Sequence, residues 1–303
     1  MKIDRRSFVV GAGAAAISAL SSGESRAAEN GEAARIKFGA CCGMPDVPLL
    51  KSVGYDFWES SVAAAFNPAK DDEWWKRQRD RLLAAPLPLR SCNGFIPGKF
   101  RLTGPKADFA PALDYGEKAL RRAEEVGVKT IVFGSGGARN VPGDFLSSDW
   151  PDVEKGARQY VKFCRELCSR VSDLKGVAVV IEPLRPNESN IMNFVWQGAA
   201  ACREVDSPRL RLLADIFHML MGGESARSIV DAAEFLRHCH IASYGTRQFP
   251  GFDKAADERF APYFAALKEI GYSGGVSCEC SWGEKGDYAR NLETALRTMK
   301  GFI

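Results

Sequence analysis

The sequence lacks several features that would assign the protein to a particular class. No apolar run reaches the roughly 18 to 20 residues that a membrane-spanning helix needs. Neither sign of charge dominates, because the chain has 41 lysines and arginines and 38 aspartates and glutamates. Nothing in this balance indicates nucleic acid or an anionic membrane as a partner. No CxxC pair occurs. No linker of low complexity interrupts the chain after residue 35, so a single domain is expected there.

The N-terminal part of the chain has the three regions of an export signal in order. A charged region with Arg5 and Arg6 precedes a short, weakly apolar stretch and then small residues that suit a signal peptidase. The arginine pair followed by Phe8 resembles a twin-arginine signal. We expect residues 1–27 to be a twin-arginine signal peptide, which binds the twin-arginine export machinery and is removed by a signal peptidase, and residues 28–34 to be a linker. The mature protein would then be periplasmic or otherwise exported, without stable membrane insertion.

Nine cysteines are spread along the chain, at positions 41, 42, 92, 164, 168, 202, 239, 278 and 280. Because their number is odd, at least one remains unpaired within the chain. An exported protein can form disulfides, and the sequence does not choose the partners. We expect most of these thiols to be small apolar side chains that pack between strands and helices.

Short apolar runs alternate with helical patterns from residue 36 onward, which is typical of repeated βα units and a parallel sheet. Eight runs predict strands, at 36–41, 56–60, 89–93, 130–134, 177–182, 210–215, 236–241 and 275–280. Helical spacing of apolar residues is found at 115–126, 153–171, 194–204, 225–236, 258–270 and 288–299. The first strand is not followed by a phosphate-binding glycine turn, which disfavours an open doubly wound sheet. We predict an α/β protein with one (β/α)8 TIM barrel over residues 35–303.

Acidic or histidine side chains lie at the ends of the last four predicted strands. They are Glu182, Asp215, His240 and Glu279, one for each strand. Because the functional residues of such barrels lie where the strands end, these side chains should converge on one rim. Three carboxylates there would repel one another, and a divalent cation removes that cost. Three oxygen ligands and one imidazole predict a single Mn²⁺, with Mg²⁺, Co²⁺ or Zn²⁺ as alternatives.

Strand alternation sets the direction of the neighbouring side chains. If Glu279 points into the barrel, the cysteines on either side of it face the helix layer. Cys239 faces the helices in the same way when His240 points inward. His238 shares the inward face one layer deeper, and we expect it to be a buried, hydrogen-bonded core histidine. The cysteines are therefore not expected among the metal ligands.

Three stretches of the sequence resemble motifs of the xylose-isomerase-like barrel superfamily of sugar phosphate isomerases and epimerases, the ketose 3-epimerases above all. They are IEPLRPNESN from residue 181, DIFHM from residue 215, and His240 with Arg247, followed by Glu279. The resemblance covers roughly residues 35–300. It implies that Glu182 and Glu279 are acid/base residues as well as metal ligands, and that Asp215 and His240 bind the same ion. It also implies that Glu188, His218 and Arg247 contact the substrate.

The expected activity is that of a metal-dependent sugar isomerase or epimerase acting on a small carbohydrate. Glu182 or Glu279 would remove the proton beside a polarised carbonyl, giving a metal-stabilised enediolate, and the other glutamate would return a proton. A lyase or dehydratase of keto-sugars, keto-glycosides or inososes would use nearly the same residues. A non-catalytic, exported sugar-binding barrel is a second alternative. The three-zinc nuclease branch of the superfamily is excluded by only three histidines and by the small net charge.

Other residues near the predicted rim give weaker signals. Glu59 after the second strand and Asn93 after the third are predicted to line the substrate pocket, and a structural role fits the sequence equally well. The glycine-rich run 134–137 follows the fourth strand. It lacks the lysine of a phosphate-binding loop, so a plain turn is the favoured interpretation.

Tryptophans offer flat apolar faces that suit either sugar stacking or core packing. Trp58, Trp196 and Trp282 are candidates for a sugar contact, and core packing is the alternative at each position. Trp74 and Trp75 begin an amphipathic pattern. They are expected to pack on the barrel or to form a contact in a homo-oligomer.

Overall fold

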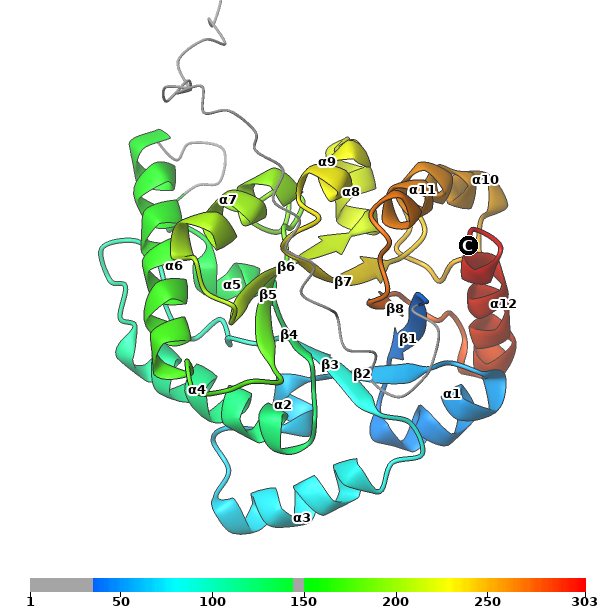
Figure 1. Ribbon diagram of the computed structural model, residues 1–303, viewed down its shortest axis with the longest axis horizontal. Helices are drawn as coiled ribbons and strands as arrows, with labels where there is room; N and C mark the ends of the chain where they lie inside the picture. The colour runs from blue at the N-terminus through cyan, green and yellow to red at the C-terminus, as the bar shows by residue number, and fades with distance from the viewer. Residues whose placement is uncertain (1–34, 144–149) are drawn as a thin grey trace, which may run out of the picture. The chain divides into compact units, whose positions relative to one another are not determined.

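The structure is a computed structural model that describes residues 35–143 and 150–303. The predicted signal peptide and linker, residues 1–27 and 28–34, lie outside the described residues. The compact unit Arg35–Ile303 forms a closed barrel of eight parallel strands, which follow one another around the ring in chain order (Figure 1). The predicted (β/α)8 barrel is confirmed.

Every predicted strand is present, with small differences at the ends. The strands are β1 Lys37–Cys41, β2 Phe57–Ser61, β3 Leu89–Asn93, β4 Thr130–Phe133, β5 Ala178–Ile181, β6 Leu210–Asp215, β7 Leu236–Ile241 and β8 Gly275–Cys278. The fifth strand was predicted to reach Glu182, but it ends one residue earlier. Pro183 follows and has no N–H to donate to a sheet ladder, so β5 cannot continue.

The helices lie outside the ring of strands (Figure 1). The longer ones are α1 Val47–Val53, α3 Asp72–Leu83, α4 Ala110–Glu125, α6 Trp150–Arg170, α7 Val195–Val205, α8 Ile216–Gly222, α11 Ala261–Glu269 and α12 Tyr288–Lys300. Short helices are α2 Val62–Ala65, α5 Gly136–Arg139, α9 Arg227–Asp231 and α10 Lys254–Asp257, and the 3-10 turns are η1 Met44–Asp46, η2 Glu258–Phe260 and η3 Lys285–Asp287. Among the described residues, none of the helices combines the length and apolar character needed to cross a bilayer.

The helix predicted at 225–236 was too long. Only α9, Arg227–Asp231, is helical in this part of the chain. The backbone N–H of Phe235 bonds to the carbonyl of Ala232 at 3.0 Å, which closes a tight turn just before β7 begins at Leu236. A local turn and the pairing of β7 with its neighbours therefore override the helical spacing of apolar residues in this segment.

The interior of the barrel is filled in layers from its N-terminal side. Phe57, the first residue of β2, points inward, and two glycines leave space for its ring. A Cβ atom at Gly39 would lie 2.2 Å from the Phe57 ring, and one at Gly275 would lie 2.9 Å from it. The ring of His238 packs next, with its centroid 6.1 Å from that of Phe57. The polar residues of the interior therefore lie on the C-terminal side of a layer formed by the rings of Phe57 and His238.

The outward faces of the strands pack against the helices. Cys239 and Cys278 belong to the main apolar core there, and Cys278 Sγ lies 3.6 Å from Met299 Sδ of α12. This is the outward direction that strand alternation predicts. All nine cysteines are free in the structure, and six of them are buried. Trp75 of α3 is also buried and donates from Nε1 to Glu125 Oε2 at 2.9 Å, as expected for packing on the barrel.

Candidate active site

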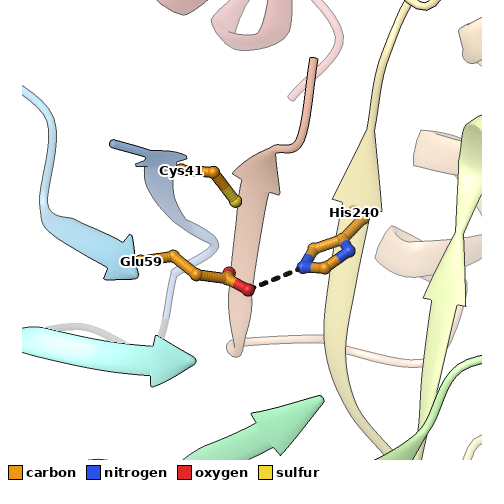
Figure 2. A group of neighbouring side chains, drawn as sticks. All are labelled: Cys41, Glu59 and His240. Carbon is orange, nitrogen blue, oxygen red and sulfur yellow. Dashed lines mark hydrogen bonds and ion pairs between the residues drawn. The ribbon is translucent and has the colours of Figure 1, made fainter. Parts of the chain in front are cut away.

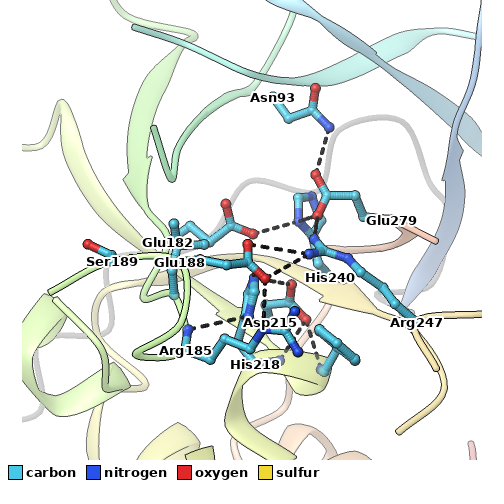
Figure 3. Close-up of polar contacts among 12 residues, drawn as sticks. Asn93, Glu182, Arg185, Glu188, Ser189, Asp215, His218, His240, Arg247 and Glu279 are labelled. Carbon is cyan, nitrogen blue, oxygen red and sulfur yellow. Dashed lines mark hydrogen bonds and ion pairs between the residues drawn. The ribbon is translucent and has the colours of Figure 1, made fainter. Parts of the chain in front are cut away.

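Four polar side chains meet at the rim formed by the C-terminal ends of β5 to β8 (Figure 3). Glu182 directly follows β5, Asp215 ends β6, His240 lies in β7 and Glu279 directly follows β8. One ligand atom from each of the four lies within 4.8 Å of the others. The structure thus brings together the four residues that were predicted as metal ligands.

The donor atoms of this cluster fit a divalent cation. His240 Nδ1 lies 3.0 Å from Glu182 Oε1 and 3.8 Å from Glu279 Oε2. Glu182, Asp215 and His240 are all buried, with exposed fractions of 5%, 2% and 0%. Ionised carboxylates in such surroundings are costly unless a positive charge balances them. Carboxylate oxygens with one imidazole suit Mn²⁺, Mg²⁺ or Co²⁺, and no sulfur is among the four donors.

The start of α8 fixes the direction of Asp215. This residue is the N-cap of the helix, and its Oδ1 accepts the backbone N–H groups of Phe217 at 2.8 Å and His218 at 3.4 Å. One carboxylate oxygen is therefore used by the fold, as is usual for an aspartate cap. The other oxygen, Oδ2, is left for the cluster.

The carboxylates and the imidazole shift the proton affinities of one another. Burial, with Glu182 and Asp215 nearby, raises the pKa of Glu279 to about 7, although His240 acts in the opposite direction. Burial alone would raise the pKa of Glu182, but its hydrogen bond with His240 lowers that pKa below the usual value. Burial disfavours the charged imidazole of His240, yet the Glu59 and Glu279 carboxylates raise its pKa well above the usual value. A cation bound here would displace protons from the cluster.

Arg247 connects the cluster to Glu188. Its guanidinium donates to Glu279 Oε2, and its Nη1 lies 3.3 Å from Glu188 Oε1 (Figure 3). The backbone of Arg247 is left-handed, with φ at 54°, and its N–H bonds to the carbonyl of Ser243 at 3.0 Å. A non-glycine residue in this conformation is uncommon and is often found at functional sites. Glu188 and Arg247, both predicted to bind substrate, therefore lie beside the ligand cluster.

His218 directs a ring nitrogen toward Asp215 and Glu188 of the same site. Its Nδ1 accepts the backbone N–H of Arg185 at 3.4 Å, so we assign the ring proton to Nε2. That Nε2 is buried and has no hydrogen-bond partner among the described residues, while Asp215 Oδ2 lies 3.5 Å away. Buried polar atoms are rarely left without a partner, so this donor suits a hydroxyl group of a bound substrate.

Arg185 and Phe217 received no role in the sequence interpretation, although both lie within the quoted motifs. Arg185 Nε donates to Glu188 Oε1 at 2.8 Å. The guanidinium carbons of Arg185 and Arg247 lie 5.1 Å and 5.0 Å from the centroid of the Phe217 ring. The three-residue spacing of Arg185 and Glu188 was the available signal for their ion pair. The shared contact with Phe217 depends on the tertiary fold and left no sequence signal.

Asn93 and Glu59 were both expected to line the pocket, and the structure places them differently. Asn93 Nδ2 donates to Glu279 Oε1 at 2.8 Å, so this residue lies at the rim (Figure 3). Glu59 is completely buried, with Oε1 3.0 Å from His240 Nε2 and Oε2 2.9 Å from His238 Nε2. Burial alone would raise the pKa of Glu59, but the two histidines keep it well below the usual range. Glu59 has no free oxygen for a substrate, whereas His238 is the hydrogen-bonded core histidine that was predicted.

The glycine-rich run after β4 lies against two glutamates of the site. A Cβ atom at Gly134 would lie 2.3 Å from Glu182 Oε2, and one at Gly136 would lie 2.4 Å from the backbone oxygen of Glu188. These glycines therefore allow the turn to pack closely against the segment that follows β5. The predicted plain turn is only partly correct, because the short helix α5 begins at Gly136 and only Gly134 and Ser135 lie between it and β4.

The three candidate tryptophans contact other parts of the protein. Trp58 is buried in the main core, Trp196 stacks on Phe194, and Trp282 stacks on Phe249. Trp196 is the most open of the three, with 59% of its surface exposed. Trp58 and Trp282 therefore follow the core-packing alternative, whereas Trp196 lies at the surface and fits neither core packing nor a contact with the ligand cluster.

Parts of the chain are similar in sequence to proteins that are named as epimerases or isomerases, some of them as putative ones. The chain is 33% identical to L-ribulose 3-epimerase of Methylomonas sp. (strain DH-1) over 106 residues, which is 35% of this chain and 36% of that protein. It is 29% identical to a putative hydroxypyruvate isomerase of Xenopus laevis over 136 residues, which is 43% of this chain and 48% of that protein. The chain thus matches less than half of the length of either relative.

Solved structures share the whole barrel. D-psicose 3-epimerase with D-tagatose from Clostridium cellulolyticum H10 has a TM-score of 0.75 and 18% identity, over 88% of this chain and 99% of that one. At this identity the likeness shows the fold alone. A family model described as xylose isomerase-like TIM barrel matches residues 47–301, which is most of the chain. The chain therefore belongs to the xylose isomerase-like TIM barrel family.

Proposed function

We propose that this chain is a divalent-metal-dependent isomerase or epimerase that moves a proton at the carbon beside a ketose carbonyl. The observation that carries the proposal is the meeting of Glu182, Asp215, His240 and Glu279 at one rim, with ligand atoms within 4.8 Å of one another. Two of these residues are glutamates, and proton transfer beside a carbonyl needs one group to take a proton and one to return it.

The two glutamates are held by different neighbours. Glu182 Oε1 lies 3.0 Å from His240 Nδ1, and Glu279 accepts from Asn93 and Arg247. A divalent cation, when bound, polarises the carbonyl and stabilises the negative charge of an enediolate. One glutamate removes the proton from the carbon next to the carbonyl, and the other delivers a proton to complete isomerisation or epimerisation. We assign both roles to this pair without fixing which residue acts first.

Three further residues orient the sugar. The unpartnered Nε2–H of His218 can donate to a substrate hydroxyl, and Glu188 and Arg247 offer an acceptor and a donor beside it. Their mutual contacts hold these groups in place before substrate arrives. Pre-set orientation contributes strongly to rate, because small displacements of the reacting carbon are costly.

The relatives support this reaction class. One is named as an L-ribulose 3-epimerase and another as a putative hydroxypyruvate isomerase, so both names describe a rearrangement beside a carbonyl. We propose Mn²⁺ as the ion, because three carboxylate oxygens and one imidazole suit it well. Mg²⁺, Co²⁺ and Zn²⁺ remain the alternatives that a metal screen would separate.

Proton NMR in deuterated water tests the proposal. Mn²⁺-loaded protein would be incubated with a panel of free ketoses, 3-keto-glycosides and hydroxy-keto acids, then the metal removed before spectra are taken. We expect deuterium at the carbon beside the carbonyl of at least one compound, with no exchange by the Asp215→Asn variant. Loss of water or aglycone would instead indicate a lyase. Binding without exchange across the panel would contradict the enzyme proposal and favour a binding barrel.

We also propose that residues 1–27 direct export by the twin-arginine route. The proposal rests on the sequence Arg5-Arg6-Ser7-Phe8 and the weakly apolar stretch after it. Cell fractionation of the full chain should find a shortened protein in the periplasm. A double Arg5→Lys, Arg6→Lys variant should stay in the cytoplasm at full length. Equal export of both chains would refute this route.

A further inference from the structure

The imidazole of His240 has a set of candidate metal ligands on each side. Glu182 and Glu279 lie on its Nδ1 side. Glu59 lies on its Nε2 side, with Cys41 nearby (Figure 2). Ligand atoms of Cys41, Glu59 and His240 also lie within 4.8 Å of one another. A neutral imidazole binds a metal only through the nitrogen without a proton, so the two sites exclude each other.

His240 Nδ1 faces the Glu182 carboxylate at 3.0 Å and Nε2 faces that of Glu59 at 3.0 Å, so Glu59 decides which nitrogen keeps its proton when a cation binds at Nδ1. Its carboxylate is completely buried and each oxygen faces one imidazole, with Oε1 3.0 Å from His240 Nε2 and Oε2 2.9 Å from His238 Nε2. An ionised carboxylate can only accept hydrogen bonds, so each histidine must donate from Nε2. His238 is itself 1% exposed and packs on the ring of Phe57. Glu59 is thus held on one side by a fixed donor.

We propose that Glu59, held by His238, is the positioning residue that keeps the proton of His240 on Nε2 and leaves Nδ1 for the divalent cation. This inference rests on the proposed metal site. Metal-binding histidines usually donate their second ring N–H to a carboxylate, which fixes the ring and increases its basicity toward the metal. Glu59 and His238 act through His240 and do not touch the substrate. Cys41, on the protonated side, is not a ligand.

Three substitutions of similar size to the native residues test the role of Glu59 and His238. Glu59→Gln keeps one acceptor oxygen but replaces the other with an NH₂ group, so it cannot accept from both histidines. We expect the affinity for Mn²⁺, measured by calorimetry, to fall by about 10- to 100-fold. His238→Phe, which removes the donor to Glu59, should weaken Mn²⁺ binding in the same direction. His238→Gln keeps a donor at this place and should restore most of the affinity.

The tautomer itself can be observed, because the whole chain contains three histidines. Full chain labelled with ¹⁵N-histidine and loaded with diamagnetic Zn²⁺ gives six ring-nitrogen resonances in a long-range ¹H–¹⁵N spectrum. We expect Nε2 of His240 and His238 to be protonated and Nδ1 of His240 to carry the shift of a metal-bound nitrogen. Cys41→Ser should leave this pattern and the Zn²⁺ affinity unchanged.

The outcomes separate this inference from the proposed function. A metal-bound Nε2 on His240, with Zn²⁺ binding lost in Cys41→Ser, would overturn the role of Glu59 while leaving a metal enzyme. Unchanged Mn²⁺ affinity in both Glu59→Gln and His238→Phe would also overturn it. A wild-type chain that binds neither ion would instead contradict the metal site on which the proposed function rests. The wild-type spectrum decides the question even if a variant fails to fold.

Discussion

Asn93 and Glu279 are joined by a hydrogen bond of 2.8 Å from Asn93 Nδ2 to Glu279 Oε1, which links the end of β3 to the residue after β8. The other oxygen of Glu279 accepts from Arg247. The proposed acid/base carboxylate is therefore held between a neutral donor and a charged one. This arrangement fixes its orientation toward the metal-ligand cluster.

Removing the neutral donor should slow turnover without unfolding the barrel. In Asn93→Ala, Glu279 Oε1 loses its donor, and we expect kcat/KM to fall by about 10- to 100-fold, as for other partners that orient metal ligands. Asn93→Asp should be worse, because two carboxylates would then face each other. Steady-state kinetics on the substrate found in the NMR screen measures both. Activity of Asn93→Asp equal to wild type would contradict the role of this hydrogen bond.

The catalytic role of Glu182 and Glu279 should be separable by mutation from their role in binding the metal. Glu182→Gln and Glu279→Gln each remove a group that can exchange a proton but keep an oxygen that can still bind a cation. Each variant should lose turnover by at least about 10²- to 10⁴-fold, the usual contribution of general acid–base catalysis. Each should retain some Mn²⁺ by elemental analysis. Near-normal activity in either variant would rule out the two-carboxylate scheme.

Cation binding should depend on pH with a definite sign. Burial raises the pKa of Glu279 to about 7, and the Glu59 and Glu279 carboxylates hold the pKa of His240 well above its usual value. Glu279 is thus about half protonated at pH 7, His240 favours its protonated form there, and both bind a cation only when deprotonated. The apparent affinity for Mn²⁺ should therefore rise with pH, by roughly tenfold per unit for each proton displaced. Calorimetry at pH 6, 7 and 8 in buffers of different ionisation enthalpy measures how many protons are released when Mn²⁺ binds. A flat affinity across that range would be inconsistent with it.

The stability of the fold should also rise with pH through Glu124, whose pKa is lowered rather than raised. This carboxylate, near the end of α4, accepts the backbone N–H groups of Lys175, Gly176 and Val177 at 2.9, 2.8 and 2.8 Å. Burial alone would raise the pKa of Glu124, but these bonds lower it. A group with a lowered folded-state pKa stabilises the fold above its unfolded pKa, and this stabilisation is lost as the pH falls through the folded value.

Glu124→Gln should therefore reduce the free energy of unfolding by about 1–3 kcal/mol at pH 7, the usual contribution of hydrogen bonds to a charged group. The difference from wild type should shrink below about pH 4, where the unfolded carboxyl is protonated. Urea titrations at pH 7 and pH 3.5 measure it. Glu293→Gln, an exposed position on α12, is the matched control and should change little at either pH. A difference of the same size at both values would disprove the assignment.

The sequence predicted the ligand cluster because two regular properties of the fold act together. Parallel strands end at one rim, and a side-chain period of two fixes which residues face inward. Asp215 and His240 could therefore be placed from their position in strands alone, whereas Glu279, predicted inside the eighth strand, directly follows it. The exact end of β5 was missed by one residue because Pro183 stops the sheet ladder.

The partner of the two histidines could not be predicted in the same way. Glu59 lies in β2 and His238 and His240 lie in β7, and these strands are not neighbours in the barrel. Their contact crosses the interior and exists only after the ring has closed. Strand alternation could place Glu59 on the inward face of the barrel. It could not show whether the carboxylate oxygens of Glu59 contact a substrate or other residues of the protein. The missed role of Phe217, which lies under two guanidiniums, has the same cause.

The most direct test of the site is to titrate metal-stripped protein with Mn²⁺ in a calorimeter and to check the bound metal by elemental analysis. The wild-type protein should bind one ion per chain. Asp215→Asn should lose that binding while its circular-dichroism spectrum stays that of the folded protein. Glu293→Gln should bind as wild type does. If the stripped wild-type chain takes up no ion, or if Asp215→Asn binds Mn²⁺ as tightly as wild type, the four rim residues are not a metal site.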